Sequence, residues 1–547
     1  MPQIGRLLRT VRHLKWGQVI GRAQFRLARP TLDLSPAPGL RSAQGGWVSP
    51  ARREASMTGP ATFRFLGENG SLDEHSWDDP VRAKLWRYNQ HYFDDLNAFD
   101  AENRKEWHAA LIERWIAENP PTVGSGWEPY PTSLRIVNWV KFALGGNELS
   151  AAVHHSLSAQ TRWLQKRLEW HLLGNHLFAN AKALVFAGLF FNGKEADEWL
   201  RAGIQILRKQ MPEQILADGA QFELSPMYHA IALEDLLDLI NLAGTFRRDD
   251  LVRKFASRIP AMLEWLLDMS HPDGDVAFFN DSAIGIAPNN ADLIRYAEDL
   301  GFVIVPSADG IAHYEQSGYA RMELGAAVVI VDLAHIGPDY LPGHAHADTL
   351  SFELSLHGSR FIVNSGTSVY GTGPERQRQR GTAAHSTLVL DEVNSSEVWS
   401  GFRVGRRARP FDVATYEDET SLIAHGAHDG YTYLPGSPVH RRKWCLSEGQ
   451  LSVEDTVQGY GVRKLEAYFH LAPGISAVAD TANGVVELSD TENDRQATFS
   501  AEGGVVEVMP SSWHPEFGLR IETTVIRVSA QRLLPHTLRC ELTWSTQ

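Results

Sequence analysis

The spacing of apolar residues along the chain changes near residue 310. Before this point, apolar residues follow the i, i+3, i+4, i+7 spacing that places them on one face of a helix. Clear examples are Leu233, Leu236, Leu237 and Ile240, then Met262, Leu263, Leu266 and Leu267, and the segments 158–172 and 175–191. The pattern predicts an all-helical first half with tryptophans scattered through it.

After residue 310 the period falls to two, and Gly, Asp, Asn and Pro turns separate short alternating runs. The strand-like runs are 326–337, 349–356, 360–366, 386–393, 450–457, 523–530 and 536–544. Many short strands without helices between them indicate antiparallel sheets packed as a sandwich. We therefore predict an α+β multidomain chain, helices first and an antiparallel β-sandwich second. A cleft between the halves is the natural ligand site.

The length of 547 residues is too great for one ordinary core, so more than one domain is expected. Residues 1–60 are basic and interrupted by prolines, which predicts a small, partly helical lead-in. Residues 61–310 then form the helical domain, and residues 311–547 form the β-sandwich.

The composition is that of a globular protein, with 43% hydrophobic and 22% charged residues. The formal net charge of −14 argues against general binding of nucleic acids. It leaves a polyanionic substrate open, because a cleft can be locally basic on an acidic protein. Basic runs occur at 375–380, 402–409 and 440–444, and most such runs are solvated faces.

No apolar run approaches the roughly 20 residues that span a bilayer, so no membrane span is expected. The N-terminus is basic but lacks the apolar core and cleavage site of a signal peptide. A complete chain is therefore expected in the cytoplasm, and a chain that lost a leader in the periplasm or outside the cell. Cys445 and Cys540 are too few for a disulfide framework and are expected to be buried free thiols.

Two histidines precede a strand-like run in the stretch "LPGHAHADTLSFELSLHGSRFIVNSGT", residues 341–367. His344 and His346 share parity, so in an extended chain both side chains point to one face. They are either ordinary polar residues at a strand entry or a site at the rim of the core. His385, ahead of a later strand, adds a third imidazole, and imidazole is the commonest metal ligand.

Three further clusters join polar and aromatic residues to predicted helix starts, and "YGTGPERQRQRGTAAHSTLVLD" adds Tyr370 to His385. Each cluster has a plain structural interpretation as well: a packed loop, an N-cap, or a packed aromatic residue. The clusters are "WEPYPTSLRIVNW" with Trp127, Tyr130 and Arg135; "HLLGNHLFANA" with Asn175 and His176; and "DGAQFELSPMYHAIALEDLL" with Tyr228 after Ser225 and Pro226.

Taken together, the clusters resemble the heparinase II/III-type polysaccharide lyases, whose wider kin include oligoalginate lyases. The resemblance runs from about residue 60 to about residue 410, in the same order and in both halves. Its motifs are "KLWRYNQHYFDDL", "GWEPYPTSLRIVNW", "GNH", "DGAQFELSPMYH", "PDGDVAFFNDS", "GHAHADTLSFEL", "RGTAAHSTLVLD" and "NSSEVWSGFRVGRRA". It implies an α/α toroid, an incomplete helical barrel, followed by the β-sandwich. It also implies cleavage at C4 of a uronic acid by β-elimination.

The resemblance also implies roles for individual residues. Asn175, helped by His176, would neutralise the uronate carboxylate, and Tyr228 would protonate the leaving oxygen. A tyrosine titrates near 10 when unperturbed, so it is protonated at neutral pH. His344 corresponds to the family's base, and Tyr370 lies where alginate-type relatives have a second tyrosine that can take this role. To act as the base, Tyr370 would need a depressed pKa, which nearby arginines or a metal could cause. The sequence does not rank His344 against Tyr370, so the choice stays open.

His346 and His385 match two zinc ligands of the family, and Asn364 occupies the position of the third, usually an aspartate. An asparagine can ligate through its amide oxygen but brings no charge. We expect one divalent metal that holds the loops, zinc ahead of manganese or calcium because the ligands include imidazoles. An empty site bridged by hydrogen bonds is the alternative. No organic cofactor is expected. Asp348 is expected only to brace the loop.

A second set of residues is expected to line a sugar-binding cleft, where aromatics stack on sugars and arginines pair with carboxylate or sulfate groups. These residues are Trp127, Tyr130, Arg135, Asp281, Trp399 and Arg403. The expected partner is an anionic polysaccharide or oligosaccharide, glycosaminoglycan-like, alginate-like or a bacterial exopolysaccharide. The chain itself is expected to be a monomer or a homodimer.

Two other functions share these features. A uronyl C5-epimerase removes the same proton but returns it to the opposite face, so it yields no ultraviolet-absorbing unsaturated product. A catalytically silent polysaccharide-binding protein in polymer assembly or export needs no catalytic residues. The presence of Asn175, Tyr228 and His344 counts against the silent protein.

Overall fold

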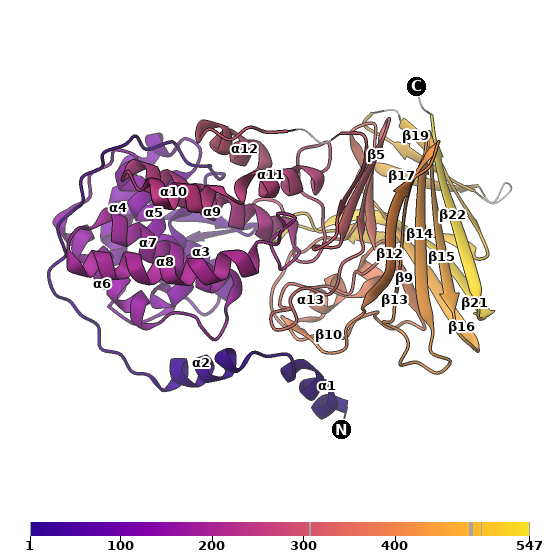
Figure 1. Ribbon diagram of the computed structural model, residues 1–547, viewed down its shortest axis with the longest axis horizontal. Coiled ribbons are helices and arrows are strands. Elements are labelled where there is room, and N and C mark those ends of the chain that lie inside the picture. Colours follow the sequence, from indigo (N-terminus) through magenta and orange to yellow (C-terminus); the bar gives the residue numbers. More distant parts are fainter. Residues whose placement is uncertain (1, 306–307, 481–484, 494, 546–547) are drawn as a thin grey trace.

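The computed structural model describes residues 2–305, 308–480, 485–493 and 495–545, and it confirms the predicted fold class. Helices make up the first half of the chain and antiparallel strands the second (Figure 1). The helices are α1 (Pro2–Val11), α2 (Trp16–Leu27), α3 (Lys84–Tyr92), α4 (Lys105–Glu118), α5 (Pro129–Leu144), α6 (Ala151–Lys166), α7 (Gly174–Phe190), α8 (Lys194–Gln214), α9 (Pro226–Thr245), α10 (Asp249–Ala256), α11 (Ile259–Asp268), α12 (Asn290–Asp299) and α13 (Pro374–Gln379).

The strands include a small sheet of β1 (Met57–Gly59), β2 (Thr62–Phe65) and β3 (Glu68–Ser71) before the helices, and a hairpin of β10 (Val398–Trp399) and β11 (Arg403–Val404). The remaining strands are β4 (Gly310–Tyr314), β5 (Tyr319–Leu324), β6 (Ala327–Asp332), β7 (Phe352–Leu356), β8 (Ser359–Val363), β9 (Leu388–Leu390), β12 (Pro410–Glu417), β13 (Ser421–His428), β14 (Val439–Ser447), β15 (Gln450–Gln458), β16 (Val462–Leu471), β17 (Ile475–Asp480), β18 (Val485–Asp490), β19 (Arg495–Glu502), β20 (Val505–Trp513), β21 (Ile521–Leu533) and β22 (His536–Trp544).

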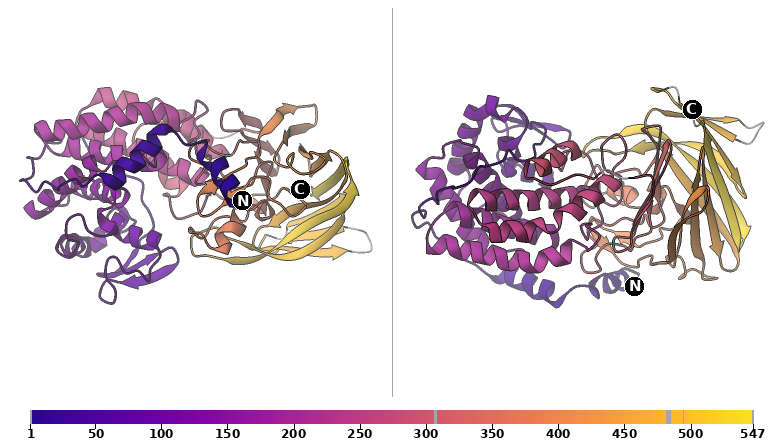
Figure 2. Two further views of the ribbon diagram at one scale, coloured as in Figure 1. Left: turned by 90° about the horizontal axis from the view of Figure 1, so that it is seen from below. Right: turned by 45° about the horizontal axis from the view of Figure 1, so that its top comes forward.

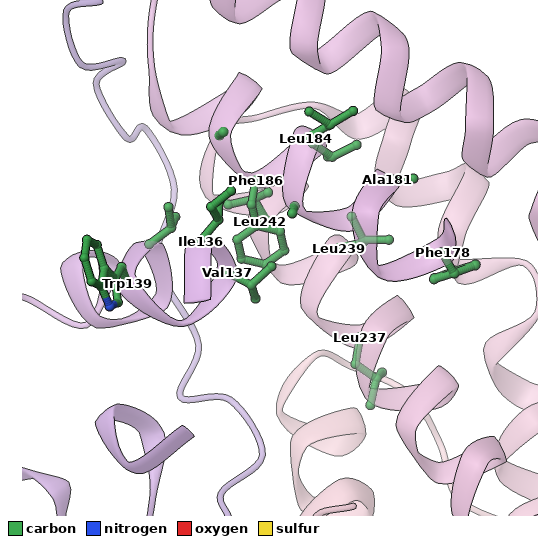
Figure 3. Packing of buried hydrophobic residues seen from close by; sticks show 14 of the residues in the cluster. Ile136, Val137, Trp139, Phe178, Ala181, Leu184, Phe186, Leu237, Leu239 and Leu242 are labelled. Carbon is green, nitrogen blue, oxygen red and sulfur yellow. The ribbon is translucent and has the colours of Figure 1, made fainter. Parts of the chain in front are cut away.

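The core of the helical half lies among α5, α7 and α9, and α8 covers α7. Helix α7 is apolar on nearly all sides because its neighbours enclose it, as expected for a central helix. Gly188 permits the close approach of α8, since a Cβ there would lie 2.5 Å from the backbone nitrogen of Leu200. Figure 3 shows part of the packing, with Ile136 of α5, Phe186 of α7 and Leu242 of α9 labelled.

Buried charges cross the same core. Lys182 of α7 donates hydrogen bonds to Asp235 and Asp238 of α9, each at 2.7 Å, and Lys141 of α5 donates to Asp238 at 3.0 Å. Asp238 and Lys182 are almost wholly buried, so water does not screen these ion pairs. The ion pairs therefore fix the register of three helices whose apolar faces alone would tolerate sliding.

The second half consists of two antiparallel sheets packed face to face, as the period-two runs predict. One sheet has the strand order β12-β13-β14-β15-β22-β19-β18-β17, and the other has β20-β21-β16-β8-β7-β6-β5-β4, with β9 paired to β16. Along β14 and β15 alternate residues are buried, and Trp444 and Val453 join Phe352 and Phe469 from the other sheet. Cys445 and Cys540 are free thiols, as expected, but only Cys540 is buried, whereas Cys445 is partly exposed.

The outer face of the second sheet is covered where the two halves meet. Trp265 lies in the last turn of α11 and Met269 just after the helix. Both pack against Tyr319 of β5 and Ile330 of β6. All residues of β6 and β7 are consequently buried on both faces. The two halves thus share an apolar contact in addition to their own cores.

The histidine stretch departs from the sequence expectation in one respect. We expected the strand to follow His344 and His346 directly, but β7 begins only at Phe352. Leu350 has a φ of 65°, which a strand residue cannot adopt, so the chain turns before it enters the sheet. The two histidines consequently lie in the loop before β7.

Helices α1 and α2 lie outside both cores, along one side of the molecule (Figures 1 and 2). Arg9 of α1 pairs with Glu397 beside the β10–β11 hairpin, and Gln18 of α2 donates to the carbonyl oxygen of Tyr340. Among the described residues, no helix is both long and apolar enough to cross a membrane.

The buried ion pairs of the helical half give a first prediction. Lys182→Met should lower the free energy of unfolding by about 3–5 kcal/mol, because it leaves the carboxylates of Asp235 and Asp238 buried without this cation. Urea unfolding measures the effect, with Lys209→Met, at an exposed position of α8, as the control expected within about 0.5 kcal/mol of the unaltered chain. Equal stability of the two variants would contradict the role given to Lys182.

Candidate active site

Three predicted residues meet where the two halves touch. The Tyr228 hydroxyl, from the first turn of α9, lies 3.0 Å from the Tyr370 hydroxyl, from the loop after β8. The His344 ring stacks on the Tyr228 ring at a centroid distance of 4.0 Å. Phe402, between β10 and β11, packs edge-on against Tyr370 and His344. The cluster therefore combines one residue of the helical half with residues of the β half.

Local sequence explains the position of Tyr228. Ser225 is the N-cap of α9, and its hydroxyl accepts a hydrogen bond from the backbone N–H of Tyr228, while Pro226 occupies the first helical position. The same hydroxyl donates to the backbone carbonyl of Asp281 at 2.7 Å. The start of α9 is thereby tied to the segment that holds the histidines.

Asp281 is the centre of that segment. Its carboxylate accepts hydrogen bonds from His344 Nδ1 at 2.9 Å, from His346 Nε2 at 2.8 Å and from both terminal nitrogens of Arg376. Burial opposes the charge of Asp281, but Arg376 and the two histidines outweigh it and hold the pKa of this carboxyl well below its usual value. The expectation that Asp281 lines a sugar cleft is therefore wrong, because the residue is wholly buried.

The contact with Asp281 also determines the tautomer of His344. A carboxylate facing Nδ1 requires a proton on that nitrogen, so the neutral ring carries its lone pair on Nε2. The Nε2 atom lies 3.6 Å from a carboxylate oxygen of Glu223, which is buried beside the start of α7. The hydrogen bond from Nδ1 to Asp281 thus holds the His344 ring in place and leaves Nε2 as the basic nitrogen.

The two tyrosines are protonated groups in this arrangement. Burial, together with the neighbouring Tyr370, raises the pKa of Tyr228 well above its usual value. Burial and nearby Asp281 likewise raise the pKa of Tyr370, although Arg376 acts in the opposite direction. Both hydroxyls can therefore donate protons at neutral pH, and neither is suited to accept one in this state.

Asn175 and His176 lie at the start of α7, beside the same cluster. The preceding Leu173 and Gly174 have φ values of 66° and 53°, and a Cβ on Gly174 would contact Leu341 and Glu223. Such a strained turn is frequent where a side chain must be presented at a functional site. Asn175 is partly exposed there, so its amide remains accessible.

His176 is supported from two sides. Its ring lies 4.4 Å from the ring of Tyr130, and its Nδ1 lies 3.1 Å from a carboxylate oxygen of Glu169. Burial disfavours the cationic ring, but Glu169 outweighs it, so the pKa of His176 is raised. Tyr130 is partly exposed, in keeping with its expected place at the site.

Three buried side chains form a group that could hold a metal ion: His346, Asp348 and His385, with one ligand atom of each within 4.8 Å of the others. His346 Nδ1 faces His385 Nε2 at 3.2 Å, while Asp281 holds the opposite side of the His346 ring. Burial lowers the pKa of His346 to about 4 and that of His385 well below its usual value, so both rings are neutral. Two neutral imidazoles with a carboxylate, and a second carboxylate behind one ring, fit a divalent transition metal.

Asp348, which we expected only to brace the loop, provides the carboxylate of this group. Asn364, the third ligand expected from the sequence, lies just after β8, and its amide oxygen accepts a hydrogen bond from the backbone N–H of Ser386. That oxygen retains a second lone pair, so this hydrogen bond alone does not remove Asn364 from the ligand set. Burial raises the pKa of Asp348 to about 6, and a bound cation would favour its charged form.

Several expected sugar contacts lie elsewhere. Arg135 is wholly buried and donates to Gln160 and to the backbone carbonyls of His91 and Gly126, so it is not available to a ligand. Trp127 is buried in the helical core. Trp399 and the exposed Arg403 lie on the β10–β11 hairpin, where Trp399 donates to Thr10 of α1. These four residues do not join the cluster around His344.

Sequence reasoning missed Glu223, Arg376 and Phe402. Arg376 belongs to a basic run that was interpreted as a solvated face, yet it is wholly buried against Asp281. Arg380, four residues later, is also buried and donates to the backbone carbonyl of Ala345, whereas Arg378 lies on the other side of α13. The i, i+4 spacing of two arginines was the available signal.

The family model described as "Heparinase II/III N-terminus" matches residues 71–297, and "Heparinase II/III-like, C-terminal" matches residues 307–545. A protein named heparin-sulfate lyase from Pedobacter heparinus is 28% identical over 273 residues, 44% of this chain and 40% of that protein. Another from Bacteroides stercoris is 26% identical over 253 residues, 42% of this chain and 37% of that protein.

Among solved structures, one titled "Crystal Structure of Heparinase III" aligns with a TM-score of 0.65 at 19% identity. The alignment covers 88% of this chain and 80% of that one. At this identity the likeness shows a common fold. The two relatives named above match the chain over less than half of their own lengths.

The buried pair of Asp281 and Arg376 gives a second prediction. Asp281→Asn should lower the free energy of unfolding by about 3–5 kcal/mol at neutral pH, because it leaves Arg376 buried without its anion. The pKa of Asp281 is depressed by folding. Its contribution is therefore fully present above about pH 4, the ordinary aspartate pKa, and is lost as the pH falls below it.

Urea unfolding at a series of pH values tests this expectation. The difference between the unaltered chain and Asp281→Asn should narrow as the pH falls below about 4. Asp412→Asn, which alters an exposed ion pair, is the control and should change stability by less than about 1 kcal/mol. A difference that stays constant over the whole pH range would refute the account of Asp281.

Proposed function

Because the chain belongs to the heparinase II/III-like family, we propose that it is a lyase that cleaves a uronic-acid-containing polysaccharide by β-elimination. The observation that carries the proposal is the contact of Tyr228, His344 and Tyr370 across the two halves. This contact supports the proposal because it brings a protonated hydroxyl, which can donate a proton, close to an imidazole nitrogen, which can accept one. The names of the two relatives favour heparan sulfate as the first polymer to test.

The reaction begins with removal of the proton at C5 of the uronic acid. His344 Nε2 is the proposed base, because Asp281 holds the proton on Nδ1 and leaves the Nε2 lone pair free. As the ring becomes cationic, the Asp281 carboxylate stabilises it. Tyr370 is the weaker candidate, because its pKa is raised whereas a tyrosine base needs a depressed one.

The proton removal needs a neutralised carboxylate on the sugar, since only then is C5–H acidic enough. Asn175 can donate its amide N–H to that carboxylate, and His176 can add a positive charge that Glu169 maintains. As the C4–O bond breaks, the C4–C5 double bond forms and Tyr228 donates its hydroxyl proton to the leaving oxygen. Tyr370, hydrogen-bonded to Tyr228, orients this hydroxyl.

A divalent metal, with zinc the best match to the imidazoles, is proposed for the group of His346, Asp348 and His385. When bound, it would anchor the loops that carry His344 and His385. His346 links this group to the reaction, because the same Asp281 carboxylate accepts hydrogen bonds from His346 and His344. The metal's part is thus structural, and the chemistry of the sugar remains with the side chains around His344.

Tyr228→Phe should lower kcat by about a hundredfold or more while KM changes little, because it removes the acid without removing the ring that stacks on His344. The assay follows the ultraviolet absorbance of unsaturated ends with heparan sulfate, chondroitin, hyaluronan and alginate. Tyr433→Phe, an exposed tyrosine, is the control.

Two other outcomes would change the proposed function or the role of Tyr228. Unchanged turnover of Tyr228→Phe would reject the acid assignment. Exchange of the C5 hydrogen with solvent deuterium, without chain cleavage, would identify an epimerase in place of the lyase.

The metal group gives a separate prediction. His385→Ala should reduce the zinc content of the purified protein to near zero and lower its Tm, because a metal bound to the native state contributes to folding stability. His425→Ala, a partly exposed histidine of β13, is the control. Addition of a chelator should lower the Tm of the unaltered chain and leave that of His385→Ala unchanged. Full metal content in the His385 variant would exclude this group as the site.

A further inference from the structure

The two N-terminal helices turn their apolar sides away from the protein. Helix α1 exposes Ile4, Leu7, Leu8 and Val11, which the i, i+3, i+4, i+7 spacing places on one face. Helix α2 exposes Trp16, Ile20 and Leu27, spaced so that they form a single stripe with Val19 at its edge. Trp16 and Leu27 are each 80% exposed.

This orientation is the reverse of the usual one. A surface helix of a globular protein normally packs its apolar stripe on the core and leaves its polar side in water. Here, the polar side of α1 contacts the protein, with Arg6 and Arg9 bound to Glu397 and Thr10 accepting from Trp399. The apolar stripe of α1 is therefore left to solvent by the way in which the helix is attached.

Helix α2 is attached in a similar way. Its buried side consists of Gln18 and Gly21, and Gly21 lies against the backbone of Trp170 and His171. Phe25, on the same side, stacks with His171 at 4.2 Å. The side opposite to these contacts carries Trp16, Ile20 and Leu27, and the view from below in Figure 2 shows both helices uncovered.

The charge of the segment indicates what covers the two stripes. Residues 1–30 contain seven Lys and Arg residues and no Asp or Glu, in a chain with a formal net charge of −14. Arg22 and Arg26 are exposed and, four residues apart, follow one flank of the α2 stripe. An apolar face with a cationic flank and a tryptophan at one end is the pattern of helices that lie in the interface of an anionic bilayer.

We propose that α1 and α2 dock on the surface of a lipid bilayer with anionic headgroups. The apolar stripes would enter the boundary between headgroups and acyl chains, and Arg22 and Arg26 would bind the headgroup phosphates. The hairpin that holds α1 through Glu397 and Trp399 also carries Phe402 to the candidate active site. Docking would thus fix the orientation of that site relative to the membrane. The docking proposal does not depend on the lyase chemistry.

The test uses the full chain and sedimentation with lipid vesicles. Binding to phosphatidylcholine vesicles that contain phosphatidylglycerol should exceed binding to pure phosphatidylcholine vesicles at least tenfold, and added NaCl should weaken it. Two sets of substitutions separate the apolar and the charged contributions. The first is Trp16→Gln with Ile20→Gln and Leu27→Gln, and the second is Arg22→Gln with Arg26→Gln.

The first set should lower the partition coefficient at least tenfold at low and at high salt. The second should lower it about fivefold for each arginine at low salt, and the effect should vanish at high salt. The matched controls change exposed residues of the β-sandwich: Val462→Gln with Leu533→Gln, and Arg495→Gln with Arg532→Gln. Neither control should change vesicle binding.

All variants should keep the Tm of the unaltered chain, because the altered side chains lie on the outside of the fold. Absence of vesicle binding, equal binding to neutral and anionic vesicles, or equal loss in the controls would overturn the proposal. Light scattering measures whether the chain is a monomer or a dimer. A dimer that the apolar substitutions dissociate, without vesicle binding, would assign the stripes to a second copy of the chain and reject the membrane.

Discussion

The buried carboxylate of Asp281 is the interaction on which the candidate active site depends. It accepts hydrogen bonds from His344 and His346 and pairs with Arg376. Asp281, His346 and Arg376 are wholly buried, whereas His344 is partly exposed. A single anion among these donors is far cheaper to bury than an isolated charge, because Arg376 compensates it and the imidazoles satisfy its oxygens. The same carboxylate sets the tautomers of both histidines. Positions and protonation states in the site therefore have a common origin.

The site exists only when the two halves of the chain are assembled. Tyr228 belongs to the helical half, while His344 and Tyr370 belong to the β half. The N-cap of α9 bonds to the backbone of Asp281, and the backbone N–H of Asp281 in turn donates to the carbonyl of His344. Loss of the interface would thus separate Tyr228 from His344 and Tyr370. The same contacts therefore determine both the stability of the junction and the geometry of the site.

The sequence predicted what depends on local spacing and missed what depends on distant contacts. Strands β15 and β22 follow from the period of 2, because their burial alternates along the strand. The apolar spacing also predicted helix α9, although nearly all of its residues are buried. The position of Tyr228 follows from the Ser-Pro start of its helix. The burial of Arg376 does not follow from the sequence, because its partner is 95 residues away. The place of Asp348 beside His385 is of the same kind, since only the fold brings these two residues together.

The charge differs between regions of the chain, and the net charge does not show these differences. The chain is acidic as a whole, yet all charged residues of its segment 1–30 are basic, and the candidate active site contains His176, whose pKa is raised by Glu169. A polyanion approaching the site would meet repulsion from most of the surface and attraction at a few places. Because exposed charges are screened beyond roughly 10 Å at ordinary salt, only those few places matter for binding. Net charge therefore limits how widely the protein binds anions, and local charge determines where it binds them.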